Sequence, residues 1–268
     1  MSALTVVVLT LNEEQHLTDC LASLRPLACP VVVVDALSTD ATVAIARDAG
    51  ATVLEHAFQG FADQRNWALQ HAAQTPWVLF VDADERLTPA GCAEIRSALA
   101  GSDGDRCTVS LGWIPRRNLL FGREFRGGGW WPDYQARLLR RGAAHYLVAR
   151  EVHEIAVGNG GDWYFREPLV HLNYATRSEF VRKQRAYTDR RVAHDPESPR
   201  RRRLIGAPLR ELHRRLLLLH GYRDGRDGLF VAVVLAREEL RAMRALRRAA
   251  RTAENAPPAA LPPRSADA

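Results

Sequence analysis

Asp82 and Asp84 stand one residue apart, directly after an apolar run at residues 78–81. Four apolar residues that end in a polar cluster are typical of a buried parallel strand whose carboxyl end opens into a site. On an extended backbone, side chains two residues apart point to the same side, so two carboxylates there repel each other. A divalent metal ion would relieve that repulsion. The alternative is that both residues only cap a helix that begins near Pro89.

The elements that would position these carboxylates alternate between strand and helix. Apolar, β-branched runs predict four strands, at residues 4–9, 31–34, 52–54 and 78–82. Helical spacing and capping residues predict helices between them, at residues 17–24, 38–49 and 61–72. This alternation predicts an α/β fold with a Rossmann-like, mostly parallel sheet flanked by helices. In such a sheet ligands bind at the carboxyl ends of the strands, where Asp82 and Asp84 are expected.

Two common phosphate-binding patterns are absent from the sequence. No G-x-G-x-x-G follows the first expected strand, and no Walker-type glycine loop with a lysine is present. Phosphates would therefore be held by a metal ion and by arginine. Arg137, Arg140 and Arg141 lie in an expected strand, where one of them either reaches a pyrophosphate or all form a solvated edge.

Composition indicates a soluble globular protein. The chain has 268 residues, 47% of them hydrophobic, and a formal net charge of +6. Its four cysteines, at positions 20, 29, 92 and 107, show no C-x-x-C spacing and are expected to be reduced, as in a cytoplasmic protein. The N-terminus has no secretory-signal pattern. The apolar run at residues 229–236 is far shorter than the roughly 20 residues that a membrane-spanning helix needs.

The C-terminal third is rich in arginine and leucine. We expect an amphipathic helix at residues 179–191, a break at 195–199, and two further helical pieces separated by the glycine-containing segment 221–228. Arginines beside apolar faces suit helices that lie on an anionic bilayer. The alternative is that these helices pack on the catalytic domain or on a second subunit.

Three regions are expected along the chain. Residues 1–175 form a catalytic domain, residues 176–253 a helical appendage that associates with a membrane or a partner, and residues 254–268, rich in Ala and Pro, a disordered tail.

Several motifs together resemble those of a known family. TLNEE follows the first expected strand, VVVVDALSTD spans the second, QRNWAL lies in the third helix, and FVDADE ends the fourth strand. In this order the chain resembles the family 2 inverting glycosyltransferases of the GT-A fold. The later segments WPDYQARLLRR, EVHE and GYRDGRDG are similar to the branch that includes lipopolysaccharide core glucosyltransferases of the WaaE type.

The resemblance implies a donor-binding role for residues in three of these motifs. Asp35 would contact the nucleotide base or ribose, and the loop from Thr10 through Asn12 and Glu13 would line the same pocket. Arg65 and Asn66 would face the donor from the start of their helix.

The resemblance also implies a division of work between the two aspartates. Asp82 would be directed mainly towards the ribose and sugar, while Asp84 would bind the Mg²⁺ or Mn²⁺ that bridges the diphosphate. Such an ion neutralises the charge that develops on a departing nucleoside diphosphate.

By the same resemblance, Glu154 takes the position of the catalytic base. An attacking hydroxyl must lose a proton, so a carboxylate within about 3 Å of it is required. Read from the residues alone, Glu154 is an exposed acid paired with a nearby arginine. Glu151 and Asp133 are the fallback candidates. His153 is a third metal ligand, a donor to phosphate or a packed histidine.

Residues 119–131 are expected to form a mobile loop. Gly127, Gly128 and Gly129 would act as hinges, and Trp130 and Trp131 would stack on a sugar or dip into lipid. The alternative is that both tryptophans belong to the core.

We therefore predict a metal-dependent hexosyltransferase at the inner face of the cytoplasmic membrane. It would move a sugar, with inversion, from a nucleotide-diphosphate donor to a lipid-linked or saccharide acceptor in cell-envelope glycan synthesis. One alternative is a catalytically inactive scaffold of the same fold. Another is a nucleic-acid-binding protein that uses the basic run at residues 200–203, but no aromatic residues are interleaved there, and no nucleic acid partner is expected.

Overall fold

The computed structural model describes residues 3–72, 74–101, 108–147, 155–194 and 206–254. They form two compact units, Met1–Glu179 and Phe180–Ala268, and each unit is considered by itself.

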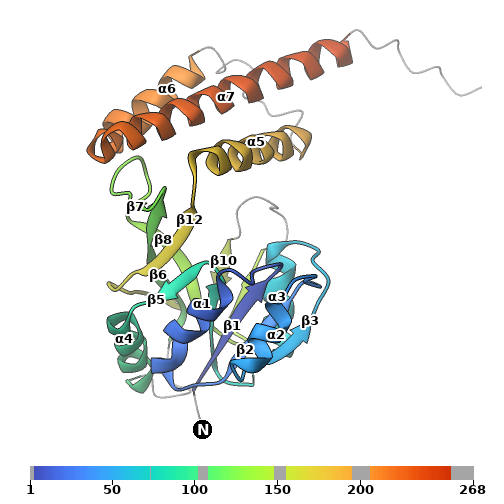
Figure 1. Ribbon diagram of the computed structural model, residues 1–268, viewed down its shortest axis with the longest axis vertical. Coiled ribbons are helices and arrows are strands. Elements are labelled where there is room, and N and C mark those ends of the chain that lie inside the picture. Colours follow the sequence, from blue (N-terminus) through green and yellow to red (C-terminus); the bar gives the residue numbers. More distant parts are fainter. Residues whose placement is uncertain (1–2, 73, 102–107, 148–154, 195–205, 255–268) are drawn as a thin grey trace, which may run out of the picture. The chain divides into compact units, whose positions relative to one another are not determined.

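The first unit begins with four parallel strands, which are β1 (Leu4–Thr10), β2 (Val31–Asp35), β3 (Thr52–Glu55) and β4 (Trp77–Asp82). They lie side by side in the order β3-β2-β1-β4 (Figure 1). The connections carry α1 (Leu17–Leu24), α2 (Thr42–Asp48) and α3 (Phe61–His71). The predicted strand–helix alternation is confirmed, and with it the α/β fold.

The sheet continues beyond β4 with mixed pairing. β8 (Asp133–Arg140) pairs antiparallel with β4, and β6 (Val109–Leu120) and β12 (Leu169–Tyr174) follow it. The short β5 (Glu85–Leu87) closes the order, while β7 (Arg123–Glu124) and β11 (Gly161–Tyr164) pair with β6. α4 (Pro89–Ala100) follows β5, and β9 (Ala144–Tyr146) with β10 (Ala156–Gly158) forms a separate two-stranded sheet.

Both faces of the central strands are buried, which explains why these strands read as continuous apolar runs. On one face Val6, Val8 and Leu79 pack with residues of α1 and α4. On the other face Val7 and Phe80 pack with residues of α3.

The turn after β4 corrects one step of the sequence reasoning. Ala83 and Asp84 form a turn between β4 and β5, so Asp82 and Asp84 do not alternate along an extended strand. The suggestion that they cap the next helix is also wrong, because Thr88 caps α4 by accepting a hydrogen bond from the N–H of Gly91 at 3.0 Å.

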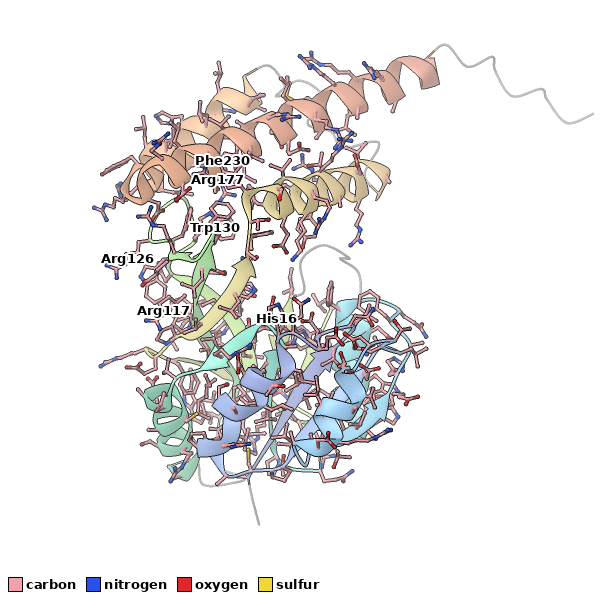
Figure 2. All side chains as sticks on the ribbon, viewed as in Figure 1. His16, Arg117, Arg126, Trp130, Arg177 and Phe230 are labelled. Atoms are coloured by element: carbon pink, nitrogen blue, oxygen red, sulfur yellow. The ribbon has the colours of Figure 1, made fainter. Side chains whose placement is uncertain are left out.

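The predicted loop at residues 119–131 is wrong in its first half. Leu119 and Leu120 end β6, and a tight turn leads into β7, which pairs back onto β6. Leu120 is fully buried, so burial of this apolar end favours a strand there. Trp130 lies in the following segment and contacts Tyr174 edge to face (Figure 2).

The second unit is helical. It holds α5 (Arg177–His194) from Phe180 onward, then α6 (Ala207–His213), the π-helical η4 (Arg214–Leu218), the 3₁₀-helical η5 (Gly221–Asp224) and α7 (Gly225–Glu254). α6 packs beside α7 (Figure 1). In α5 only Phe180 and Thr188 are buried among the side chains that the structure describes, so its predicted amphipathic face is narrow.

The predicted interruption at residues 221–228 is wrong in its second half, because α7 already begins at Gly225 and Gly228 lies within it. A Cβ at Gly228 would lie 2.0 Å from the carbonyl oxygen of Gly221, so η5 can approach α7 this closely only because residue 228 is glycine. Within the described ranges, no helix has the length and apolarity needed to cross a membrane. The predicted break at 195–199 and residues 255–268 of the predicted tail lie outside the described residues.

Gly112 in β6 offers a test of the core. A Cβ there would lie 2.8 Å from Cβ of Leu138 and 2.9 Å from Cε2 of Phe165. Gly112→Ala should therefore lower the free energy of unfolding by about 1–3 kcal/mol through overpacking. Gly101→Ala, whose Cβ would meet no atom closer than 3.8 Å, should change it by less than about 0.5 kcal/mol. Urea denaturation measures both, and equal effects would contradict this account of the core.

Candidate functional site

The carboxyl ends of β1, β2 and β4 meet at one edge of the sheet. Thr10 lies beside Asp35, and Leu9 lies beside Asp82. β1 is also where the strand order reverses, since β2 lies on one side of it and β4 on the other. Ligands of doubly wound folds bind at such a point. The structure thus brings together three residues that the sequence predicted for the site, Thr10, Asp35 and Asp82.

Asp35 is only 1% exposed, and its carboxylate is occupied internally. Oδ1 accepts hydrogen bonds from the hydroxyls of Thr10 (2.8 Å) and Ser38 (2.6 Å), and Oδ2 accepts one from the N–H of Ser38 (2.7 Å). In this arrangement Asp35 holds the ends of β1 and β2 together.

Two loops beyond these strands are cross-linked by side-chain to backbone hydrogen bonds. The Asn12 N–H donates to the Ser38 hydroxyl (2.8 Å), and the Thr39 N–H donates to Oδ1 of Asn12 (2.8 Å). The N–H of Glu13 donates to the Thr42 hydroxyl (2.8 Å). Asn12 and Glu13 therefore fix the shape of the loop, and their role in donor binding stays a prediction.

Leu11 and Leu37 project from these two loops and are 49% and 54% exposed. Leu37 has a left-handed backbone, with φ of 66°, directly after the strand end that carries Asp35. Strained backbone of this kind gathers at ligand sites. Sequence reasoning did not single out either leucine, because an apolar residue beside a polar motif carries no pattern of its own.

Asp82, whose side chain is 30% exposed, belongs to a cluster of five charges with Arg65, Arg137, Glu85 and Arg116. Its Oδ1 accepts a hydrogen bond from Nη2 of Arg65 (2.9 Å), and its Oδ2 accepts one from Arg137. Arg137 also donates to Oε1 of Glu85 (2.5 Å), and Oε2 of Glu85 accepts the N–H of Asp82 (3.0 Å). Burial alone would raise the pKa of Asp82, but the charges of Arg137 and Arg65 outweigh it and hold that pKa well below its ordinary value.

Arg65 and Asn66 have structural partners. The guanidinium of Arg65 lies over the rings of Phe80 and Tyr146, at 5.3 and 5.5 Å. The side chain of Asn66 exchanges two 2.8 Å hydrogen bonds with the backbone of Tyr146. Arg65 thus neutralises Asp82 while Asn66 attaches β9 to α3. Arg137, expected at a pyrophosphate or at a solvated edge, is instead buried between Asp82 and Glu85.

Asp84 faces a histidine that sequence reasoning missed. Its Oδ2 lies 3.4 Å from Nε2 of His171, which comes from β12, and its side chain is 29% exposed. The other ring nitrogen, Nδ1, lies 2.7 Å from Oδ1 of Asn118. That oxygen also accepts a hydrogen bond from Asn173, while the Asn118 amide nitrogen donates to the carbonyl of Trp130 and to Asp133. Asn118 is therefore oriented with its acceptor towards His171.

This orientation has a consequence for a cation. With Nδ1 donating to Asn118, Nε2 of a neutral ring would turn its lone pair towards the Asp84 carboxylate, whereas Nε2 of a protonated ring would form an ion pair with that carboxylate. A lone pair and a carboxylate facing each other at 3.4 Å are suited to holding a cation between them. Within the described ranges, no group of three or more His, Cys, Asp or Glu side chains is arranged to hold a metal. An ion at Asp84 and His171 would thus need further ligands from substrate and water, as Mg²⁺ often does.

Of the predicted candidates for a general base, the structure describes Asp133. Asp133 is bound by Arg116 (2.7 Å to Nη2), Asn118 and Gln135. Burial would raise the pKa of Asp133, but Arg116 and these hydrogen bonds lower it, which makes Asp133 a poor proton acceptor. Glu154, Glu151 and His153 lie outside the described residues.

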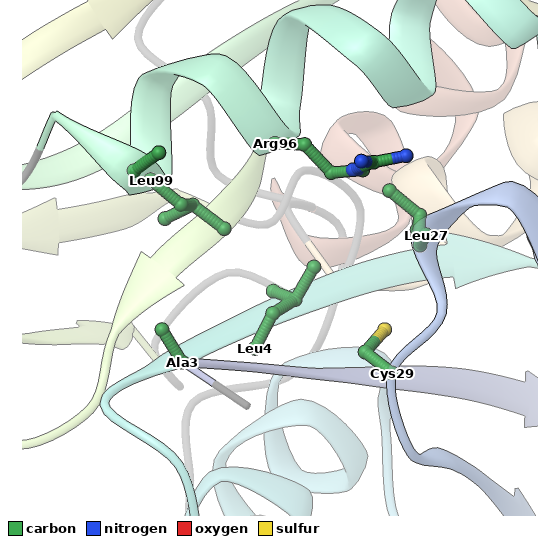
Figure 3. Close-up of a pocket in the computed structure, with 7 residues that line it drawn as sticks. Ala3, Leu4, Leu27, Cys29, Arg96 and Leu99 are labelled. Carbon is green, nitrogen blue, oxygen red and sulfur yellow. The ribbon is translucent and has the colours of Figure 1, made fainter. Parts of the chain in front are cut away.

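A cavity of about 240 Å³ lies elsewhere in this unit (Figure 3). Leu4, Leu27, Cys29, Arg96 and Leu99 contribute to its lining. Leu4 begins β1, whereas Thr10 ends it, so this cavity is at the opposite end of the strand from the acidic cluster. It is separate from the candidate site.

The buried charge cluster can be tested by a double-mutant cycle. Arg137→Met should lower the free energy of unfolding by up to about 3–5 kcal/mol, because Glu85, with no exposed surface, would keep only the more distant Arg116, at 3.8 Å, as an ion-pair partner among the described residues. Adding Glu85→Gln should recover part of this loss. Urea denaturation of both single variants and the double variant measures the coupling. Strictly additive effects would show that the two side chains are energetically independent.

Comparison with solved structures finds partial likenesses. One is glucosyl-3-phosphoglycerate synthase from Mycobacterium tuberculosis, in complex with Mn²⁺, UDP and glucosyl-3-phosphoglycerate. It is 24% identical, covers 42% of this chain and 44% of its own, and has a TM-score of 0.37.

Sequence relatives are more informative. The lipopolysaccharide core biosynthesis glycosyltransferase LpsC of Rhizobium meliloti (strain 1021) is 32% identical over 207 residues, which is 75% of this chain and 74% of that protein. An uncharacterized glycosyltransferase of Rickettsia felis (strain ATCC VR-1525 / URRWXCal2) is 33% identical over 40% of this chain and 37% of its own length. The model of the family described as glycosyl transferase family 2 matches residues 5–151. The chain therefore belongs to glycosyl transferase family 2.

Proposed function

We propose that this glycosyltransferase moves a sugar from a nucleotide-diphosphate donor to a lipid-linked or saccharide acceptor, with inversion at the anomeric carbon. The observation that supports this most is the placement of Asp82 and Asp84 at the carboxyl end of β4, beside the loops that Asp35 holds, in a chain of this family. Donor pocket and acidic turn then share one edge of the sheet.

In this proposal the nucleoside lies against the loops after β1 and β2. Leu11 and Leu37 offer exposed apolar surface to a base, and the cross-links of Asn12 keep their loops in place before the donor arrives. Preorganised loops reduce the entropy that is lost on binding.

Asp84 and His171 would hold Mg²⁺ or Mn²⁺. When bound, such an ion neutralises the charge that builds on the leaving diphosphate. Asn118 keeps the lone pair of His171 aimed at Asp84, while the neutralised cluster around Asp82 supports the turn without adding repulsion.

Glu154 is proposed as the general base, by its place in the EVHE segment. It would take the proton of the attacking acceptor hydroxyl, and a single in-line displacement would invert the anomeric centre. Asp133 is unsuited to this task because Arg116 and its hydrogen bonds favour its ionised form.

The acceptor is proposed from the named relative. LpsC carries the description of a lipopolysaccharide core biosynthesis enzyme. A lipid-linked saccharide of the cell envelope is therefore the acceptor we propose, with the protein working as a peripheral protein at the inner face of the cytoplasmic membrane.

The metal assignment predicts that two variants lose both transfer activity and metal-dependent donor binding. Asp84→Asn and His171→Gln should each reduce transfer by at least about tenfold and weaken Mn²⁺-dependent donor binding, since second-shell or ligand changes at metal sites cost about 10–100-fold. Asp48→Asn, at an exposed helical acid, is the matched control. Isothermal titration of donor with and without Mn²⁺ separates binding from turnover. Unchanged metal-dependent binding in both site variants would refute the assignment.

The base assignment predicts a different signature. Glu154→Gln should leave donor affinity unchanged and lower turnover by about 10²–10⁴-fold. The product of the unmodified enzyme should show the anomeric configuration opposite to that of the donor by NMR. Retention of configuration would refute the single displacement, and failure to turn over any nucleotide sugar would favour the inactive-scaffold alternative.

A further inference from the structure

The second unit exposes large apolar side chains at one corner. η4, η5 and α7 contact one another there. Leu217 and Leu218 of η4 are 56% and 62% exposed, Tyr222 of η5 is 55% exposed, and Leu229 and Val233 of α7 are 50% and 48% exposed. These five residues are called the apolar corner below. Several large apolar residues exposed together usually mark an interaction surface.

The outer face of α7 continues this surface as a regular stripe. The exposed residues that lie within about one third of a turn of each other, at the helical period of 3.6, include Arg226, Leu229, Val233, Arg237, Arg244 and Arg247. The other side of the helix, which includes Val231, Val234 and Ala242, is buried. α7 therefore packs by one apolar face and presents a second one that is bordered by arginine.

The charge of this unit is strongly one-sided. The segment from residue 206 to residue 249 contains ten arginines and five acidic residues. Asp224, Asp227 and Glu238 are buried. Glu211 is bound by Arg214 and Arg215, and Glu239 by Arg191. The acidic charges are thus buried or already paired.

Three arginines beside the apolar corner stay available. Arg223, Arg226 and Arg237 form no ion pair with any residue in the described part of the chain. A surface with leucine and tyrosine at its centre and unneutralised arginine at its border matches an anionic bilayer, whose acyl boundary takes apolar side chains and whose phosphates attract arginine.

We propose that the apolar corner and these three arginines are a docking surface for anionic phospholipid. Leu217, Leu218 and Leu229 enter the headgroup region, and Arg223 and Arg226 bind phosphate. This inference rests on the proposed work at a membrane, and it adds the residues that form the surface. It involves no residue of the candidate active site.

Vesicle flotation of the full chain tests this docking surface. The protein should float with phosphatidylcholine vesicles that contain phosphatidylglycerol, and not with phosphatidylcholine alone. High salt should weaken the binding, because screening reduces attraction between exposed charges. A chain that stays unbound with anionic vesicles at low salt would overturn the proposal.

Paired variants then locate the surface. Leu217→Asp with Leu218→Asp should lower the partition coefficient at least about tenfold, and Arg223→Ala with Arg226→Ala should lower it about fivefold for each arginine. Phe58→Asp and Arg47→Ala, at exposed positions of the first unit, are the matched controls and should bind like the unmodified chain. Circular dichroism melting checks that every variant is folded.

Two further outcomes would contradict docking to lipid. Equal losses in the test and control variants would place lipid binding elsewhere. A concentration-dependent dimer that Leu217→Asp dissociates, without vesicle binding, would show that a second copy covers the corner. Metal-dependent donor binding, measured without lipid, reports on the proposed catalytic function separately.

Discussion

The whole candidate site depends on one compensated cluster of buried charge. Glu85 has no exposed surface and the Asp82 side chain is 30% exposed, and buried ionised carboxylates are costly unless they are paired. Arg65 comes from α3 and Arg137 from β8, so the pairing also joins the parallel half of the sheet to its mixed half. Removing Arg137 would take a counter-ion from both carboxylates at once, and the turn that carries Asp84 is built directly on this cluster.

The cluster divides the acidic residues by role. Asp82 and Asp35 each accept several internal hydrogen bonds and serve as supports. Asp84, whose side chain is 29% exposed against 30% for Asp82, instead faces an imidazole that Asn118 orients. Arginines thereby neutralise Asp82, and Asp84 is the carboxylate at this edge that a bound cation would neutralise. The loops after β1 and β2 show the same division. The hydrogen bond from Asn12 to Ser38 joins the two loops, while Leu11 and Leu37 are exposed to solvent.

Much of the parallel half could be predicted from the sequence, because each strand is buried on both faces and its apolar run is short and uninterrupted. The meeting of Thr10, Asp35 and Asp82 followed from the topology. The turn at Ala83 and Asp84 did not, since it depends on β5 pairing with β12, far along the chain. His171 and Asn118 were missed for the same reason: 53 residues separate them, and neither belongs to a recognisable motif. At residues 119–131, the glycine and tryptophan content suggested a loop, but Leu119 and Leu120 belong to β6, where the side chain of Leu120 is buried.

β12 has a bearing on how such chains can be recombined. The family model matches residues 5–151, yet His171 and the N–H of Leu172 that binds the Asp84 carbonyl at 2.9 Å come from beyond that match. Only two residues separate β12 from α5, the helix that leads into the second unit. A chimera that exchanges the helical unit between relatives would therefore need its junction after Tyr174. An earlier junction would replace β12, and with it the residues that contact Asp84, by those of the relative.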